Sequence, residues 1–189
     1  MSLNNAHEGY DYQDLITSYF ILKEILDGNL DSVFSIDKKN TTGDIPDRFD
    51  DLVITNGADI QRKQIKYSNE SVSKTLIKDY LSSDSHYSIA LHKLFETWKE
   101  LKTSNTEFRL CLAWVEPTND DITRVLELQP NKSSFNDFST KVFKINLDLL
   151  WEENPEIFNR WNSLSRNMGS AISSSQSIGN SCFLRVFFT

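Results

Sequence analysis

The segment from residue 48 to 68, RFDDLVITNGADIQRKQIKYS, brings together residue types that can hold a metal ion beside a phosphate. Asp51 comes first, and Gln64 and Lys66 follow two residues apart. A carboxylate binds a hard divalent cation through oxygen, and the cation lowers the pKa of a bound water. A nearby lysine can orient that water or offset charge that builds on phosphorus. The spacing therefore suits metal-assisted hydrolysis of a phosphodiester.

A hairpin has to position these side chains. The runs DDLVIT and ADIQRKQIKY alternate as strands do, and Asn56-Gly57 between them favours a two-residue turn. That turn would place Asp51 opposite Arg62. Asp51, Gln64 and Lys66 would then share one face, with Gln64 diagonal to Asp51 at about 7–8 Å. The alternative is a plain surface hairpin in which these residues only meet solvent.

Residues 11–27 predict a helix that carries two more polar candidates. Gln13 and Glu24 are eleven residues apart, close to three full turns, so they lie on one face. The helix also carries an apolar stripe that is wide, so we expect it to be covered on most sides. That stripe consists of Leu15, Tyr19, Leu22 and Leu26, widened by Ile16, Phe20 and Ile25.

The remaining chain alternates between strand and helix patterns. We expect strands at 32–36, 107–116 and 141–147, and helices at 71–83, 85–102, 120–128 and 155–168. This order predicts an α/β fold with a mixed central sheet of four or more strands flanked by helices. We expect one domain over residues 1–165. Residues 166–189 read as a serine-rich tail or linker whose apolar end is either a last strand or the start of a further region.

Composition narrows the function classes. The chain has 189 residues and a formal charge of −7, which argues against a binder that holds nucleic acid by charge alone. Its two cysteines show no metal-ligand spacing, and its three histidines form no zinc motif; we expect His86 and His92 on a helix surface. No apolar run is long enough to span a bilayer, so we expect no membrane partner. Because only two cysteines occur, we expect a reduced, cytoplasmic setting.

Taken together, Asp51, Gln64-x-Lys66 and the segment GYDYQDL before a helix resemble the PD-(D/E)xK nuclease superfamily in its Gln-x-Lys variant. The likeness spans about residues 9–120. Within this superfamily, the chain looks most similar to the double-stranded DNA endonuclease domains of bacterial antiphage effectors. The resemblance implies a restriction-endonuclease-like fold and an endonuclease that uses Mg²⁺ or Mn²⁺ on double-stranded DNA.

The resemblance also assigns roles by position. Asp51 would be the metal-binding acid, Gln64 the second ligand or a residue that positions it, and Lys66 the catalytic lysine. Gln13 belongs to the Tyr-Gln signature, and a helix glutamate such as Glu24 often completes the metal site. Two further expectations concern the surroundings of the site. Asp37 would be an additional metal ligand, and Arg62 would lie either on a phosphate-contacting rim, which we favour, or on a solvated face.

Two departures keep other readings open. Gln64 is neutral, so metal binding should be weaker than with a Glu unless Glu24 or Asp37 contributes. Asp37 stands where the family tends to show Glu. The chain is therefore either an active nuclease, a catalytically idle nuclease fold that serves DNA binding or assembly, or an interaction module of a defence complex.

A small basic rim would neutralise few phosphates, so one copy should bind DNA weakly. We therefore expect a homo-oligomer or a larger effector assembly.

Overall fold

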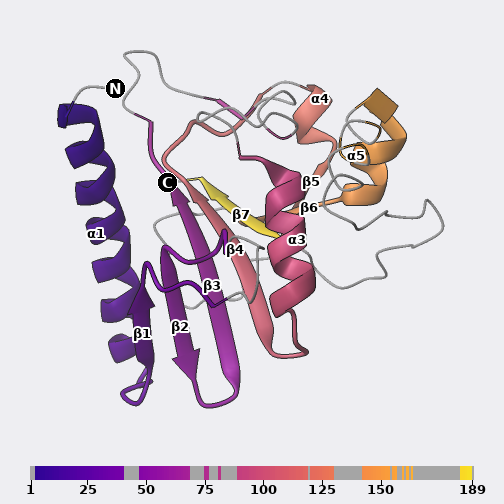
Figure 1. Cartoon of the computed structure of the whole chain (residues 1–189). Helices are drawn as coiled ribbons and strands as arrows, with labels where there is room; N and C mark the ends of the chain where they lie inside the picture. The colour runs from indigo at the N-terminus through magenta and orange to yellow at the C-terminus, as the bar shows by residue number, and fades with distance from the viewer. Residues whose placement is uncertain are drawn as a thin grey trace.

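A seven-stranded mixed sheet organises the chain (Figure 1). The computed structural model describes residues 3–40, 47–68, 75–76, 81, 89–118, 120–129, 142–153, 155–156, 159, 161, 163 and 184–188. The strands are β1 (Val33–Ile36), β2 (Leu52–Asn56), β3 (Asp59–Lys66), β4 (Thr106–Leu112), β5 (Leu126–Gln129), β6 (Val142–Ile145) and β7 (Arg185–Phe188). The helices are α1 (Leu3–Leu26), α3 (Leu91–Leu101), α4 (Asp120–Thr123) and α5 (Leu147–Glu153).

The strands stand in the order β1-β2-β3-β4-β7-β6-β5. β1, β2 and β3 form an antiparallel meander, β4 runs parallel to β3, and β7 runs parallel to β4. β6 and β5 then continue the sheet in antiparallel pairs. The predicted α/β fold with a mixed central sheet and flanking helices is confirmed. The apolar chain end forms β7 in the interior of this sheet.

The two faces of the β2–β3–β4 region bury different clusters. α1 packs Ile16 and Phe20 against Leu52, Ile65 and Cys111 on one face. The larger core lies on the other face, where α3 contributes four apolar side chains at helical spacing: Leu91, Leu94, Phe95 and Trp98. Because neighbouring residues of a strand point to opposite faces, β4 contributes Cys111 to the cluster under α1 and Leu110 and Leu112 to the larger core.

Several predicted elements differ in extent. The first helix begins at Leu3 rather than at residue 11, and the helix predicted over 85–102 begins at Leu91. The helix predicted over 120–128 ends at Thr123, and Leu126–Gln129 form the strand β5 instead. α5 was not expected, while the helices predicted at 71–83 and 155–168 fall largely outside the described residues. None of the helices in the described part of the chain is both long and apolar enough to cross a membrane.

Candidate active site

The β2–β3 hairpin brings the three main candidates together. Its turn is at Gly57-Ala58, and Gly57 has a φ of 58°, which suits the first central position of a type II′ turn. The pairing therefore differs by two residues from the one expected for an Asn56-Gly57 turn, and Val53 faces Arg62. A shift of two keeps each side chain on its predicted face. It also places Asp51, just before β2, across from Gln64 instead of diagonal to it.

Asp51 is held by two donors from β3. The backbone N–H of Ile65 donates to Asp51 Oδ2 at 2.6 Å, and the side-chain amide of Gln64 donates to the same oxygen. Gln64 is buried and Lys66 is half-buried. Gln64 pairs with Leu110 and Lys66 with Leu112 on the adjacent β4, so both side chains lie on the face that carries α3.

Burial dominates the electrostatics of this group. It raises the pKa of Asp51 to about 6, although the Ile65 N–H, the Lys66 charge and the Gln64 amide all act to lower it. Burial also lowers the pKa of Lys66, an effect that the Asp51 charge opposes. The pKa of Asp50 is raised as well, chiefly by desolvation. A carboxylate and an amine that are both disfavoured in their charged forms are typical of functional sites.

The middle of α1 lies near the same end of the sheet. Gln13 Nε2 donates to Asp37 Oδ1 at 3.1 Å, at the residue that follows β1. Tyr12 packs against Tyr67, directly after Lys66, with ring centroids 5.3 Å apart. The charge of Asp37 also contributes to the raised pKa of Asp50. The Tyr-Gln signature, the acid after β1 and the end of β3 are thus neighbours.

Glu24 and Arg62 have other partners. Glu24 Oε2 accepts hydrogen bonds from Asn29 Nδ2 at 2.9 Å and Ser32 Oγ at 3.1 Å, so it fixes the turn between α1 and β1. Arg62 is 8% exposed and forms an ion pair with the buried Asp47 at 3.6 Å. The structure therefore joins neither residue to Asp51, and Arg62 does not line an open rim.

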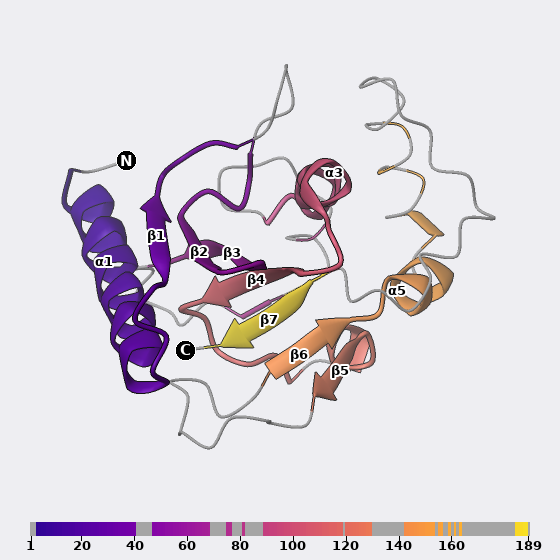
Figure 2. The same ribbon diagram turned by 90° about the horizontal axis from the view of Figure 1, so that it is seen from below.

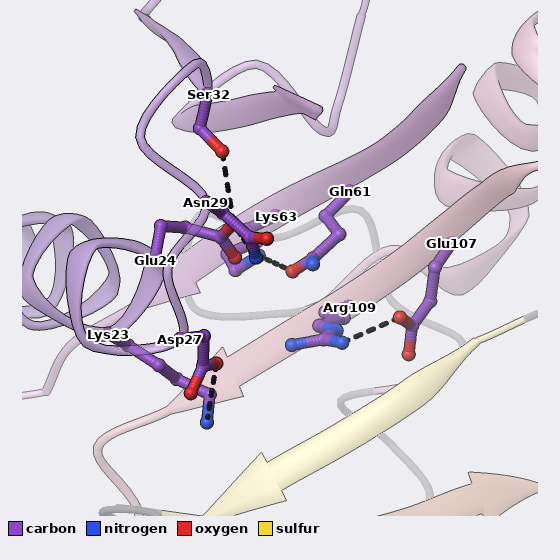
Figure 3. Close-up of polar contacts among 9 residues, drawn as sticks. All are labelled: Lys23, Glu24, Asp27, Asn29, Ser32, Gln61, Lys63, Glu107 and Arg109. Carbon is purple, nitrogen blue, oxygen red and sulfur yellow. Dashed lines mark hydrogen bonds and ion pairs between the residues drawn. The ribbon is translucent and has the colours of Figure 1, made fainter. Parts of the chain in front are cut away.

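β3 also contains a second Gln-x-Lys pair, which the sequence reading passed over. Gln61 and Lys63 point to the α1 face, and Lys63 Nζ donates to Gln61 Oε1 at 2.7 Å (Figure 3). Lys63 is fully buried, with its ammonium 4.2 Å from the centre of the Phe20 ring. Desolvation, then the charge of Arg109, lowers its pKa well below the usual value. An amine so enclosed cannot contact a phosphate, so the Gln64-Lys66 pair is the candidate.

The donor chemistry at Asp51 is compatible with a hard divalent cation. Mg²⁺ is commonly bound through one or two carboxylates, with waters and substrate phosphates as its remaining ligands. Asp51 supplies one carboxylate, and half a turn of the Gln64 amide would direct its oxygen toward the same ion. Among the described residues, however, no group of three or more His, Cys, Asp and Glu could hold a metal ion. A cation here would therefore depend on substrate and water oxygens.

A cavity of about 540 Å³ lies at the opposite end of the strands. Its walls come from residues 59–61 and 102–107, with Trp98 and Arg185. From Asp59 to Lys66 β3 extends roughly 23 Å at the usual rise per residue. The cavity is therefore separate from the Asp51 group.

Comparison of the chain with protein-family models, with curated proteins and with solved structures found no match in any of the three.

Proposed function

We propose that this chain is a metal-dependent endonuclease domain that hydrolyses phosphodiester bonds in double-stranded DNA, as an effector of antiphage defence. The observation that carries the proposal is the meeting of Asp51, Gln64 and Lys66 on adjacent strands, with Gln64 donating to Asp51 and Lys66 within its electrostatic field. The choice of DNA as substrate, of Mg²⁺ or Mn²⁺ as cofactor and of defence as the setting rests on the family resemblance.

Each residue has a role that follows from its surroundings. Asp51, with a pKa of about 6, is mostly ionised at neutral pH and can act as a metal ligand. A bound Mg²⁺ or Mn²⁺ would polarise the phosphate and acidify an attacking water. Lys66 is half-buried, so its amine is accessible to a phosphate; burial lowers its pKa, and the Asp51 charge opposes that shift. Gln64 holds the Asp51 carboxylate in one orientation. Gln13 donates a hydrogen bond to Asp37, and the charge of Asp37 contributes to the raised pKa of Asp50.

One observation favours a second candidate, a catalytically idle nuclease fold that binds DNA or assembles with partners. The described residues offer no cluster of three or more His, Cys, Asp and Glu for a metal. With a neutral Gln64, an ion at Asp51 would have a single carboxylate on this face. Such a module would keep the hairpin geometry without cutting DNA.

Plasmid DNA separates the two candidates. The whole chain is incubated with supercoiled plasmid in Mg²⁺, in Mn²⁺ or in chelator, at several protein concentrations. The nuclease proposal expects nicked or linear DNA in metal and none in chelator. It also expects the loss of cutting in Lys66→Met, while Lys63→Met, its match on the other face of β3, still cuts. A wild-type chain that leaves the plasmid intact in both metals would reject the nuclease and retain the idle module.

A further inference from the structure

α1 has two apolar sides, and only one of them is buried. Ile16 and Phe20 pack against the sheet. The opposite side carries Leu15, Leu22 and Leu26, which are 54%, 59% and 69% exposed. Figures 1 and 2 show α1 beside β1 at the outer edge of the fold. A helix that is apolar on all sides is normally covered on all sides, so this exposed side suits a protein partner.

The spacing of that side is self-complementary. Leu15, Tyr19, Leu22 and Leu26, here called the outer stripe, follow one another at intervals of four, three and four residues. Tyr19 is half-buried and also packs against Phe20 of the inner side. This series is the same when read in either direction. If two copies of α1 pack antiparallel, Leu15 of each copy meets Leu26 of the other, and Tyr19 meets Leu22. An interface in which the same surface meets itself is the one that two-fold symmetry requires.

The exposed apolar surface is large enough for such an interface. Beside the outer stripe, three further apolar residues are exposed on the end of α1, on the turn after it and on β1: Ile25, Leu30 and Val33. Together these side chains present on the order of 500 Å² of apolar surface. That is about the apolar share of the 800 Å² that each partner contributes to a standard interface.

Charge also bears on the nature of the partner. The outer stripe contains no charged residue, and Lys23 beside it is paired with Asp27 of the same helix at 3.6 Å. The exposed Asp11 lies one turn before Leu15 on the same face, so the stripe itself is uncharged and only its N-terminal end is acidic. Two copies repel each other through their net charges of −7, and salt screens that repulsion. Association through the stripe should strengthen as salt is added.

From these observations we infer that the outer stripe of α1 is the interface of an antiparallel homodimer. The inference goes beyond the proposed nuclease function and does not depend on it, because its readout is the oligomeric state. Each hairpin site lies on the sheet face opposite α1, so dimerisation leaves both Asp51 groups uncovered.

Sedimentation velocity of the whole chain at micromolar concentrations, in low and in physiological salt, tests the inference. Leu22→Glu places a charge in the stripe and should weaken self-association by more than about tenfold. Leu128→Glu is the matched control, since Leu128 is 60% exposed on β5 and lies far from α1 in sequence. It should dimerise like the wild type. Circular dichroism checks that both variants fold.

Cysteine cross-linking tests the direction of packing, in a chain with Cys182 replaced by Ser. Leu15→Cys and Leu26→Cys should form a disulfide when the two variants are mixed, and much less when either is oxidised alone. A wild type that stays monomeric at every concentration and salt would overturn the inference. The stripe would then have to be covered by something other than a second copy of the chain. A dimer that persists in Leu22→Glu, or cross-links within each single variant only, would overturn it as well.

Discussion

Lys63 and Lys66 stand three residues apart on β3 and point to opposite faces of the sheet. Lys63 pairs in register with Arg109 and is enclosed beneath α1, whereas Lys66 pairs with Leu112 and keeps part of its surface in solvent. The same residue type therefore occupies a closed and an accessible position within one strand. This contrast supplies a built-in control for any activity that depends on a lysine.

The first prediction uses that contrast. Lys66→Met should lower the rate of DNA cleavage by about 10²-fold or more, the usual effect of removing one preorganised charge from a phosphoryl or acyl transfer site. Lys63→Met should keep cleavage within a few-fold of the wild type, because Lys63 touches no surface that DNA can reach. Initial rates on plasmid DNA under saturating metal provide the measurement. If Lys63→Met loses cleavage and Lys66→Met keeps it, the active site lies on the α1 face of the sheet and the proposed site is wrong.

The second prediction concerns stability. Burial lowers the pKa of Lys63, so the ammonium form is disfavoured in the folded state and the chain gains stability as pH rises toward the ordinary lysine value. Lys63→Met keeps a long apolar side chain on Phe20 and removes the amine. We expect the variant to equal or exceed the wild type by up to about 2 kcal/mol at pH 7, and by less at pH 9.

Urea unfolding at the two pH values measures this difference. Lys38→Met, at an exposed lysine after β1, is the control and should leave the free energy of unfolding unchanged at both. A clear destabilisation by Lys63→Met would mean that the contacts of the ammonium with Gln61 and the nearby Glu24 and Glu107 outweigh its desolvation.

The third prediction follows from the raised pKa of Asp51. Its folded value is about 6 and the unfolded one is near 3.8, so the folded state binds the extra proton between these values. Stability therefore falls as pH rises from about 4 to about 6 and stays low above that. Asp51→Asn removes the ionisation and should stabilise the metal-free chain at pH 7, by at most about 3 kcal/mol.

Thermal or urea unfolding across pH 4 to 8 tests it. The wild type and Asp51→Asn should have similar free energies of unfolding near pH 4. Above pH 6 the variant should be the more stable of the two. Asp59→Asn, at the exposed start of β3, controls for the loss of an acid in general. Parallel curves for wild type and Asp51→Asn would show that this carboxylate is not desolvated in solution.

The sequence predicted the fold class and the hairpin because these depend on local patterns. Asn56-Gly57 marked the turn, and the alternation along β3 assigned the face of Gln64 and Lys66. The register was off by two, since Gly57 takes the first central position of the turn and Ala58 the second. Strand alternation made the face assignment insensitive to that error.

Partners set by tertiary structure could not be read in the same way. Helical spacing put Glu24 and Gln13 on one face, yet Glu24 binds the turn at Asn29 and Ser32. His92, expected at the surface, is 2% exposed on α3. The wide apolar stripe of α1 was expected to be covered, and Leu22 and Leu26 are instead exposed. Periodicity shows that a face is apolar, not what lies against it.

The fourth prediction concerns Gln64. As it stands, its amide donates to Asp51 and stabilises the ionised carboxylate without adding charge. Gln64→Glu would replace that donor with a second carboxylate, and the two acids would repel each other in a partly buried site. Without metal, the variant should therefore melt at a lower temperature than the wild type at pH 7.

A divalent cation should reverse this order. Two carboxylates bind a hard cation more tightly than a carboxylate and an amide, and a ligand that binds only the folded state stabilises it in proportion to its affinity. We expect Mg²⁺ to raise the melting temperature of Gln64→Glu by more than it raises that of the wild type, and to have no effect on Asp51→Asn. The metal concentration for half-maximal cleavage should fall in Gln64→Glu, whereas its maximal rate need not rise, because tighter ground-state binding does not by itself favour the transition state. Equal responses to Mg²⁺ in the wild type and Gln64→Glu, with none in Asp51→Asn, would remove Gln64 from the metal site and leave Asp51 to be paired with Asp37 or Asp50. Equal responses in all three proteins would remove both Asp51 and Gln64.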